Sequence, residues 1–309
     1  MRPFMAASLP MARALPIAML VVLGLSWAIR LLAIRTAAVG GVSPIDVAMV
    51  ATAGIVLLLT LLSVARSKYP RLSRHHLRFY AATGLFGFAA PFLAEIIVAP
   101  HLSVLHFVIV VTSAPVWTVF ISIVFRLEAV DWRRVAGIVT GFMATALVIF
   151  GSQDGNQAVE FQVQPIWIAA AFSIPILYAI YVLYIAAVWP KDVDNLQGAH
   201  GQAIVALVTY FCFWLVFSEK NGDAQTLATQ WAIWVIVLSE VIALLLLFSI
   251  ARTRGGSFAS QANYVAVVAG AVIGVTYFNQ PVNWLTLAGV ILLIFALWLS
   301  SRKWAKAVA

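Results

Sequence analysis

The sequence predicts an all-helical integral membrane protein of ten transmembrane helices, arranged as two inverted five-helix repeats around a central cavity. Three observations predict this fold class: an extreme apolar composition, ten separate apolar runs, and a short motif that occurs twice. Of the 309 residues, 63% are hydrophobic and 10% are charged, and the mean hydropathy is +1.01. Soluble domains have about 25% charged residues. This composition therefore excludes a water-soluble fold.

Ten apolar runs follow one another with short connections. A helix needs roughly 20 mainly apolar residues to cross a bilayer, because its backbone amides must be paired within the segment. Suitable runs lie near residues 15–35, 45–65, 79–98, 104–126, 133–151, 165–188, 199–218, 229–251, 258–277 and 283–301. The stretches between them are too short for a folded soluble domain, so we expect a single transmembrane domain.

One motif occurs in both halves of the chain. The stretch AVDWRRVAGIV at residues 129–139 aligns with PVNWLTLAGVI at residues 281–291, so that Val130 and Trp132 coincide with Val282 and Trp284. The first copy lies between the fourth and fifth runs, and the second lies between the ninth and tenth. We therefore predict two repeats, residues 1–151 and 165–309. Because five is odd, the second repeat enters the membrane from the opposite side, as in alternating-access transporters.

The basic residues predict the orientation. Sixteen of the nineteen Lys and Arg residues fall on one side when alternate loops are counted from the N-terminus, whereas the loop GSQDGNQAVEFQVQ on the other side has none. Basic residues near span ends are retained in the cytoplasm, so both termini are predicted to be cytoplasmic. The basic loop at residues 66–78 suits anionic lipid headgroups, and we expect no nucleic-acid partner.

Three charged residues lie inside the predicted spans: Arg30, Glu95 and Glu240. A charge near the bilayer centre costs about 2.5–3.5 kcal/mol on insertion scales, so such a group faces a cavity or a partner. Arg30 could pair with either glutamate. A structural ion pair, snorkelling of Arg30 or Glu95 to the outer surface, and a role in binding substrate or a proton are all open at this point.

Aromatic and neutral polar residues of the first, fourth, sixth and ninth runs complete the predicted substrate-binding set. With Arg30, Glu95 and Glu240, this set comprises Trp27, His106, Thr112, Trp117, Tyr178, Gln261 and Tyr264. Such groups orient ligands in otherwise apolar pockets. The aromatic residues could equally anchor spans at the membrane interfaces. His106, alone near the outer end of its run, is better explained as a capped or paired histidine.

Prolines lie inside three of the predicted spans. Pro91, Pro115 and Pro175 fall in the third, fourth and sixth runs. Each removes one backbone hydrogen bond and permits a kink. Kinked helices suit the gating motions of a transporter, although prolines also occur in static spans.

Three stretches carry a resemblance to a known family: LSWAIRLLAIRTAAVGGVSP at residues 25–44, TSAPVWTVFISIVFRLEAVDWRRVAGIV at 112–139 and ILYAIYVL at 176–183. They resemble the ten-helix, EamA-like members of the drug/metabolite transporter superfamily. The hairpin with Pro115 and Glu128 is the most specific part. The sequence departs from the family where it lacks an arginine near Val50, and where Gln280 replaces the glutamate that commonly matches Glu128.

This resemblance implies a multi-pass carrier of the bacterial inner membrane that exports small metabolites by alternating access. Exporters of aromatic and other apolar amino acids, of the YddG type, are the most similar. The expected partners are a small-molecule substrate, the lipid bilayer, and a counter-substrate or proton. The alternatives are a carrier of nucleotide sugars or phosphorylated metabolites, which would need two or more basic cavity residues, and a membrane protein without transport activity.

The sequence does not predict an enzyme. It offers no nucleophile or acid–base cluster, and its five histidines show no His-x-x-x-His spacing. We accordingly expect no catalytic residues, no bound metal and no cofactor.

Overall fold

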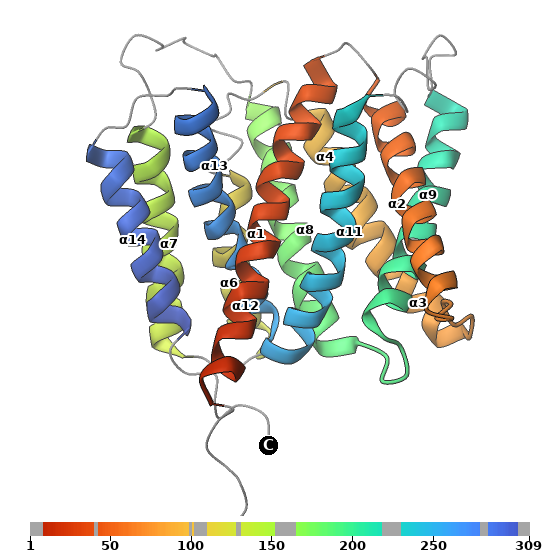
Figure 1. The fold of residues 1–309 in the computed structure, drawn as a ribbon, viewed down its shortest axis with the longest axis horizontal. Helices are drawn as coiled ribbons and strands as arrows, with labels where there is room; N and C mark the ends of the chain where they lie inside the picture. The colour runs from red at the N-terminus through yellow and green to blue at the C-terminus, as the bar shows by residue number, and fades with distance from the viewer. Residues whose placement is uncertain are drawn as a thin grey trace, which may run out of the picture.

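The computed structural model describes residues 9–39, 43–98, 101, 110–127, 131–151, 165–217, 230–278 and 284–301, and over these ranges it contains helices and no strands. The helices run up and down beside one another (Figure 1). Their bounds are α1 Leu9–Val39, α2 Pro44–Ala65, α3 Arg74–Ala82, the π-helix η1 Thr83–Ala89, α4 Ala90–Val98, α6 Ala114–Val124, α7 Trp132–Gly151, α8 Pro165–Val188, α9 Asn195–Phe217, α11 Trp231–Arg254, α12 Gly256–Ala259, α13 Ala262–Phe278 and α14 Trp284–Ser301.

Several helices can cross a membrane. Among the described residues, six helical segments are long and apolar enough, and three shorter apolar helices lie at 110–124, 135–147 and 287–296. Apolar side chains also cover the outside of the bundle, as at Leu57 and Leu61 of α2 and Val208 and Leu215 of α9, which are all more than half exposed. A helix that is apolar on every face is typical of a membrane span. The protein is thus a multi-pass membrane protein, whereas the full count of ten crossings stays a prediction.

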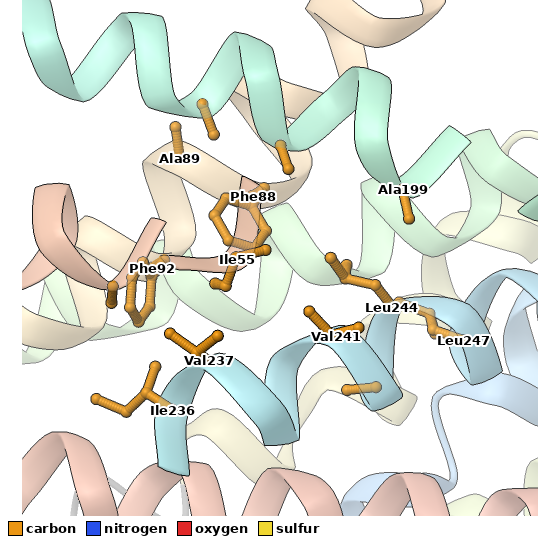
Figure 2. Packing of buried hydrophobic residues seen from close by; sticks show 14 of the residues in the cluster. Ile55, Phe88, Ala89, Phe92, Ala199, Ile236, Val237, Val241, Leu244 and Leu247 are labelled. Carbon is orange, nitrogen blue, oxygen red and sulfur yellow. The ribbon is translucent and has the colours of Figure 1, made fainter. Parts of the chain in front are cut away.

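The main core lies where α2, η1, α4, α9 and α11 converge. Ile55 of α2, Phe88 and Phe92 of the third span, and Val237 and Val241 of α11 pack together there (Figure 2). Close backbone approach brings α11 against α2, since a Cβ atom on Gly54 would lie 2.7 Å from Cγ2 of Val237. Helix α1 packs against both α11 and α13, and α7 packs along α14.

The three prolines occupy different positions in their helices. Pro91 follows the π-helix η1, in which the extra residue per turn alters the register of the third span. Pro115 lies in the first turn of α6, after a turn at Ser113, where its missing N–H costs little. Pro175 lies inside α8, as the sequence predicted. The ninth span has a further break, between α12 and α13, that no proline marks.

Polar contacts join the loops at one end of the bundle. Lys68 Nζ lies 2.7 Å from Asp194 Oδ2, and Asp192 contacts Arg71 at 2.9 Å and His76 at 3.0 Å. These contacts join the loop after α2 and the first turn of α3 to the loop after α8. The hydrogen bond with His76 holds the pKa of Asp192 below its usual value. Helix α1 begins at this same end (Figure 1); that it faces the cytoplasm stays a prediction.

Candidate polar site between the helices

Arg30 forms ion pairs with both intramembrane glutamates. Its Nη2 lies 2.9 Å from Oε2 of Glu95, and its Nε lies 3.3 Å from Oε2 of Glu240. All three residues are buried, with exposed fractions of 7%, 2% and 8% in that order. The side chains of Arg30 and Glu95 therefore point toward each other rather than snorkelling to the surface. Of the roles that the sequence left open for these charges, the contacts agree with ion pairing. One cation, Arg30, pairs with two carboxylates.

Tyr178 completes the site on the side of Glu95. Its hydroxyl donates a hydrogen bond to Oε1 of Glu95 at 3.0 Å, and Nη2 of Arg30 donates to the same oxygen at 3.2 Å. The ring of Phe92 lies 5.5 Å from Cζ of Arg30, within cation–π range. Arg30, Glu95, Glu240 and Tyr178 are called the central polar cluster below.

Four helices position this cluster. Arg30 lies on α1 and Glu95 on α4, whereas Tyr178 lies on α8 and Glu240 on α11. Each half of the chain thus supplies two of the four residues. Removing one partner of a buried charge pair costs about 3–5 kcal/mol, because the other charge is left without compensation. The cluster consequently couples the two halves energetically.

A second polar pair lies one turn further along α8. Tyr181, three residues after Tyr178 and so near the same helix face, donates its hydroxyl to Oε1 of Gln202 on α9 at 2.8 Å. Nε2 of Gln202 is buried and has no hydrogen-bond partner among the described residues. The ring of Tyr181 lies directly against Gly87 of η1, where a Cβ atom would overlap it. The π-helix thus lets the third span pack closely against α8.

The remaining predicted site residues make other contacts. Tyr264 is buried between α13 and α7, where its hydroxyl donates to the carbonyl of Ile138 at 2.7 Å. Trp27 packs at the edge of the main core, and Trp117 contacts Phe120 edge-on, with ring centroids 6.2 Å apart. Nothing in these contacts tests whether any of the three touches a substrate.

Two more predicted residues are buried near helix breaks. Thr112 precedes the turn at Ser113, and Gln261, whose Nε2 donates to the carbonyl of Ser257 at 3.4 Å, lies between α12 and α13. Helix breaks inside membranes expose backbone groups that can bind ligands. His106 lies outside the described residues.

A buried histidine, His200, was not predicted as a site residue from the sequence. Oγ1 of Thr60 donates to the carbonyl of Val56 at 2.7 Å, so it accepts a hydrogen bond from Nε2 of His200 at 3.0 Å. Nδ1 of His200 then accepts from Oγ of Ser63, at 2.9 Å. A neutral imidazole satisfies both contacts, and it joins α9 to α2. The spacing of Thr60 and Ser63, three residues apart on one face of an apolar run, was the available signal.

Among the described residues, no group of three His, Cys, Asp or Glu side chains could hold a metal ion. The arrangement instead offers a buried guanidinium, two carboxylates and tyrosine hydroxyls. Such groups can bind a small polar ligand or a proton within an apolar bundle.

Comparisons with known proteins agree with this architecture. Residues 14–150 match the EamA-like transporter family. One solved crystal structure is similar with a TM-score of 0.71 and 16% identity, and the similarity covers 92% of this chain and 98% of that one. At this identity the likeness shows the fold alone. No curated protein matches the sequence. The first half of the chain thus matches a family of transporters that move small molecules across membranes.

Proposed function

We propose that this protein is an alternating-access carrier of small metabolites in a bacterial inner membrane, and that the central polar cluster lies on its transport axis. The observation that carries the proposal is the origin of the cluster. Arg30 and Tyr178 lie on the first helix of each predicted repeat, and Glu95 and Glu240 lie on the third helix of each. In an inverted repeat, residues from equivalent helices meet near the pseudo-two-fold axis, which is where carriers bind their substrates.

The helix packing supports an inverted repeat. Helices α2 and α9 are equivalent in the two repeats and pack against each other, as do the equivalent helices α7 and α14. The contact of α1 with α11 corresponds to the contact of α8 with η1 and α4, and the contact of α1 with α13 corresponds to that of α8 with α6. Each of these packed pairs therefore maps onto itself or onto another packed pair when the repeats are exchanged. Residues 1–151 and 165–309 would then form the two units.

We infer that the substrates are neutral or zwitterionic. Arg30 is already engaged by two carboxylates, so a phosphorylated substrate would add negative charge beside Glu95 and Glu240. Each further buried anion without a partner is unfavourable. Nucleotide sugars and phosphorylated metabolites are accordingly the weaker alternative. Amino acids with aromatic or other apolar side chains, the substrates of YddG-type exporters, suit an aromatic-lined carrier better.

Transport by the purified protein tests this proposal. Proteoliposomes are preloaded with single amino acids, and counterflow of the radiolabelled compound is compared with empty liposomes. Apolar amino acids should exchange, and uridine diphosphate sugars, tested in parallel, should not. Exchange of the nucleotide sugar without exchange of any amino acid would reverse the ranking of substrates. Exchange of neither class would count against transport of these compounds.

A further inference from the structure

The buried charges of the central polar cluster do not balance. One guanidinium, on Arg30, faces two carboxylates, and the side chains of Arg30, Glu95 and Glu240 are 8%, 2% and 11% exposed. An uncompensated charge in an apolar interior is expensive, and a group in that position usually neutralises instead. A single proton on one carboxylate would make the cluster neutral.

The two carboxylates differ in how well they are held. Oε1 of Glu95 accepts hydrogen bonds from Arg30 at 3.2 Å and from Tyr178 at 3.0 Å, and its Oε2 lies 2.9 Å from the guanidinium. Oε2 of Glu240 lies 3.3 Å from Nε of Arg30, and neither this oxygen nor Oε2 of Glu95 has a hydrogen-bond partner among the described residues. The difference lies in the two hydrogen bonds to Oε1 of Glu95 and in its shorter ion pair. Hydrogen bonds to a carboxylate favour its ionised form. Glu95 is therefore the better-stabilised anion, and Glu240 is the carboxyl group that can carry the proton.

Besides Arg30 and Glu95, the described side chains of α11 and of the helices packed against it include several other titratable groups. They are Asp46 of α2, Tyr178, Tyr181 and Tyr184 of α8, His200, Tyr210 and Cys212 of α9, and Arg252 and Arg254 at the end of α11. Asp46 accepts a hydrogen bond from Trp214 at 2.8 Å, and the hydroxyl of Tyr210 donates to the carbonyl of Ala89 at 2.8 Å. His200 is engaged between Thr60 and Ser63. Arg30 is the basic group that contacts Glu240.

We propose that Glu240 is the coupling-proton site of the carrier. It holds one proton in the arrangement described, releases it to water on one side of the membrane and takes up another from the opposite side. Glu95 stays ionised as the permanent partner of Arg30. Loss of the proton leaves the cluster with a net negative charge, which strengthens the attraction between Glu240 on α11 and Arg30 on α1. These helices belong to different halves, so protonation changes the contact across which the halves move.

The coupling role rests on the proposed transport function, whereas the bound proton is a property of the folded protein and can be measured without transport. Carboxyl groups in water are ionised at neutral pH, because their ordinary pKa is about 4. The infrared C=O band of a protonated carboxylic acid, recorded at pH 7 in lipid nanodiscs, therefore reports a protonated buried carboxyl group.

We expect one such band per wild-type molecule and none in Glu240→Gln. The band should persist in Asp46→Asn, which changes another buried carboxyl group and serves as the matched control. A band that survives in Glu240→Gln, a band that disappears in Asp46→Asn, or the absence of any band from the wild type overturns the assignment.

Thermal stability gives a second measurement. Glutamine is neutral and similar in shape to protonated glutamate, so Glu240→Gln should unfold close to the wild-type temperature at pH 7. Glu95→Gln should unfold at a clearly lower temperature, because its amide replaces an anion that lies 2.9 Å from the guanidinium. Equal losses in the two variants would identify Glu240 as an ionised structural partner and would contradict the proposal.

A transport assay then tests whether Glu240 couples proton movement to substrate movement. In Glu240→Gln, accumulation driven by a pH gradient should fall to the level that counterflow alone supports, whatever the rate of that counterflow, since the amide cannot titrate. Loss of substrate binding in this variant would show that Glu240 holds a cationic group of the substrate instead, and the coupling role would be wrong. If the wild type moves no tested solute, the proposed transport function fails, while the infrared and stability results still decide whether Glu240 holds a proton.

Discussion

Gly87→Ala tests whether the close packing of the third span against α8 depends on a glycine in the π-helix. A Cβ atom at this position would lie 2.6 Å from Cγ of Tyr181 and closer still to two other carbons of the ring, compared with 3.4–4 Å for an ordinary contact. The ring of Tyr181 must therefore move by about 1 Å or more in a packed interior, which is not easily deformed. Its hydroxyl, which donates to Gln202 at 2.8 Å, moves with it.

The expected cost follows from these two effects. Inserting a methyl group into a well-packed site costs about 1–3 kcal/mol, and a weakened buried hydrogen bond adds about 1 kcal/mol. A total of about 2–4 kcal/mol corresponds to a decrease in unfolding temperature of roughly 5–10 °C, on the scale known for large soluble domains. Thermal unfolding in detergent, followed by size-exclusion chromatography, measures this decrease.

Gly270→Ala is the matched control, because a Cβ atom there would meet no atom within 4 Å. It should unfold at the wild-type temperature. In a background that carries Tyr181→Ala, Gly87→Ala should cost much less, because the overlapping ring is gone; the difference is the interaction energy of the pair. Equal stability of the Gly87 and Gly270 variants in the wild-type background would refute the packing argument.

Three further predictions concern other parts of the molecule. Replacing His200 by leucine should lower the free energy of unfolding by about 1–3 kcal/mol, because the buried hydroxyl of Ser63 loses its partner; a thermal shift within error of the wild type would contradict this role. Because the bond with His76 lowers the pKa of Asp192, its contribution is present above the unfolded value of about 4 and is lost as the pH falls through the lower folded value. Asp192→Asn should therefore speed amide exchange in residues 66–73 at pH 7, and the difference from the wild type should vanish in acid. After Cys212 is replaced, an impermeant thiol reagent should label single cysteines at Ser73 and Gly255 from the cytoplasm only. Single cysteines at Gln157 and Asn279 should be labelled from the outside. Labelling of Ser73 and Gln157 from the same side would contradict the ten-helix topology.

The sequence predicted the positions of the helices well, because lipid imposes a simple rule on them. A span must be apolar over its whole length, so the ten apolar runs could be read directly from composition. The observed helices lie at these runs wherever residues are described. The breaks within the helices were harder to predict from the sequence. A proline can be seen in a sequence, but the π-helix and the break between α12 and α13 arise from packing against neighbouring helices, as Gly87 against Tyr181 illustrates.

The same contrast applies to the site. Arg30, Glu95 and Glu240 could be selected from the sequence because charge in lipid requires a partner, and the structure pairs all three. Tyrosine carries no such requirement, since its ring is apolar and its hydroxyl can donate a hydrogen bond to any nearby carbonyl. Tyr178 and Tyr264 were therefore equivalent candidates by sequence, yet one donates to Glu95 and the other to the backbone of α7. What separates them is the nearest acceptor. For Tyr264 that acceptor is a helix carbonyl close to Gly141, where a Cβ atom would lie 2.5 Å from the tyrosine ring. Gly141 thus leaves the space that lets Tyr264 reach the backbone of α7 and join α13 to it.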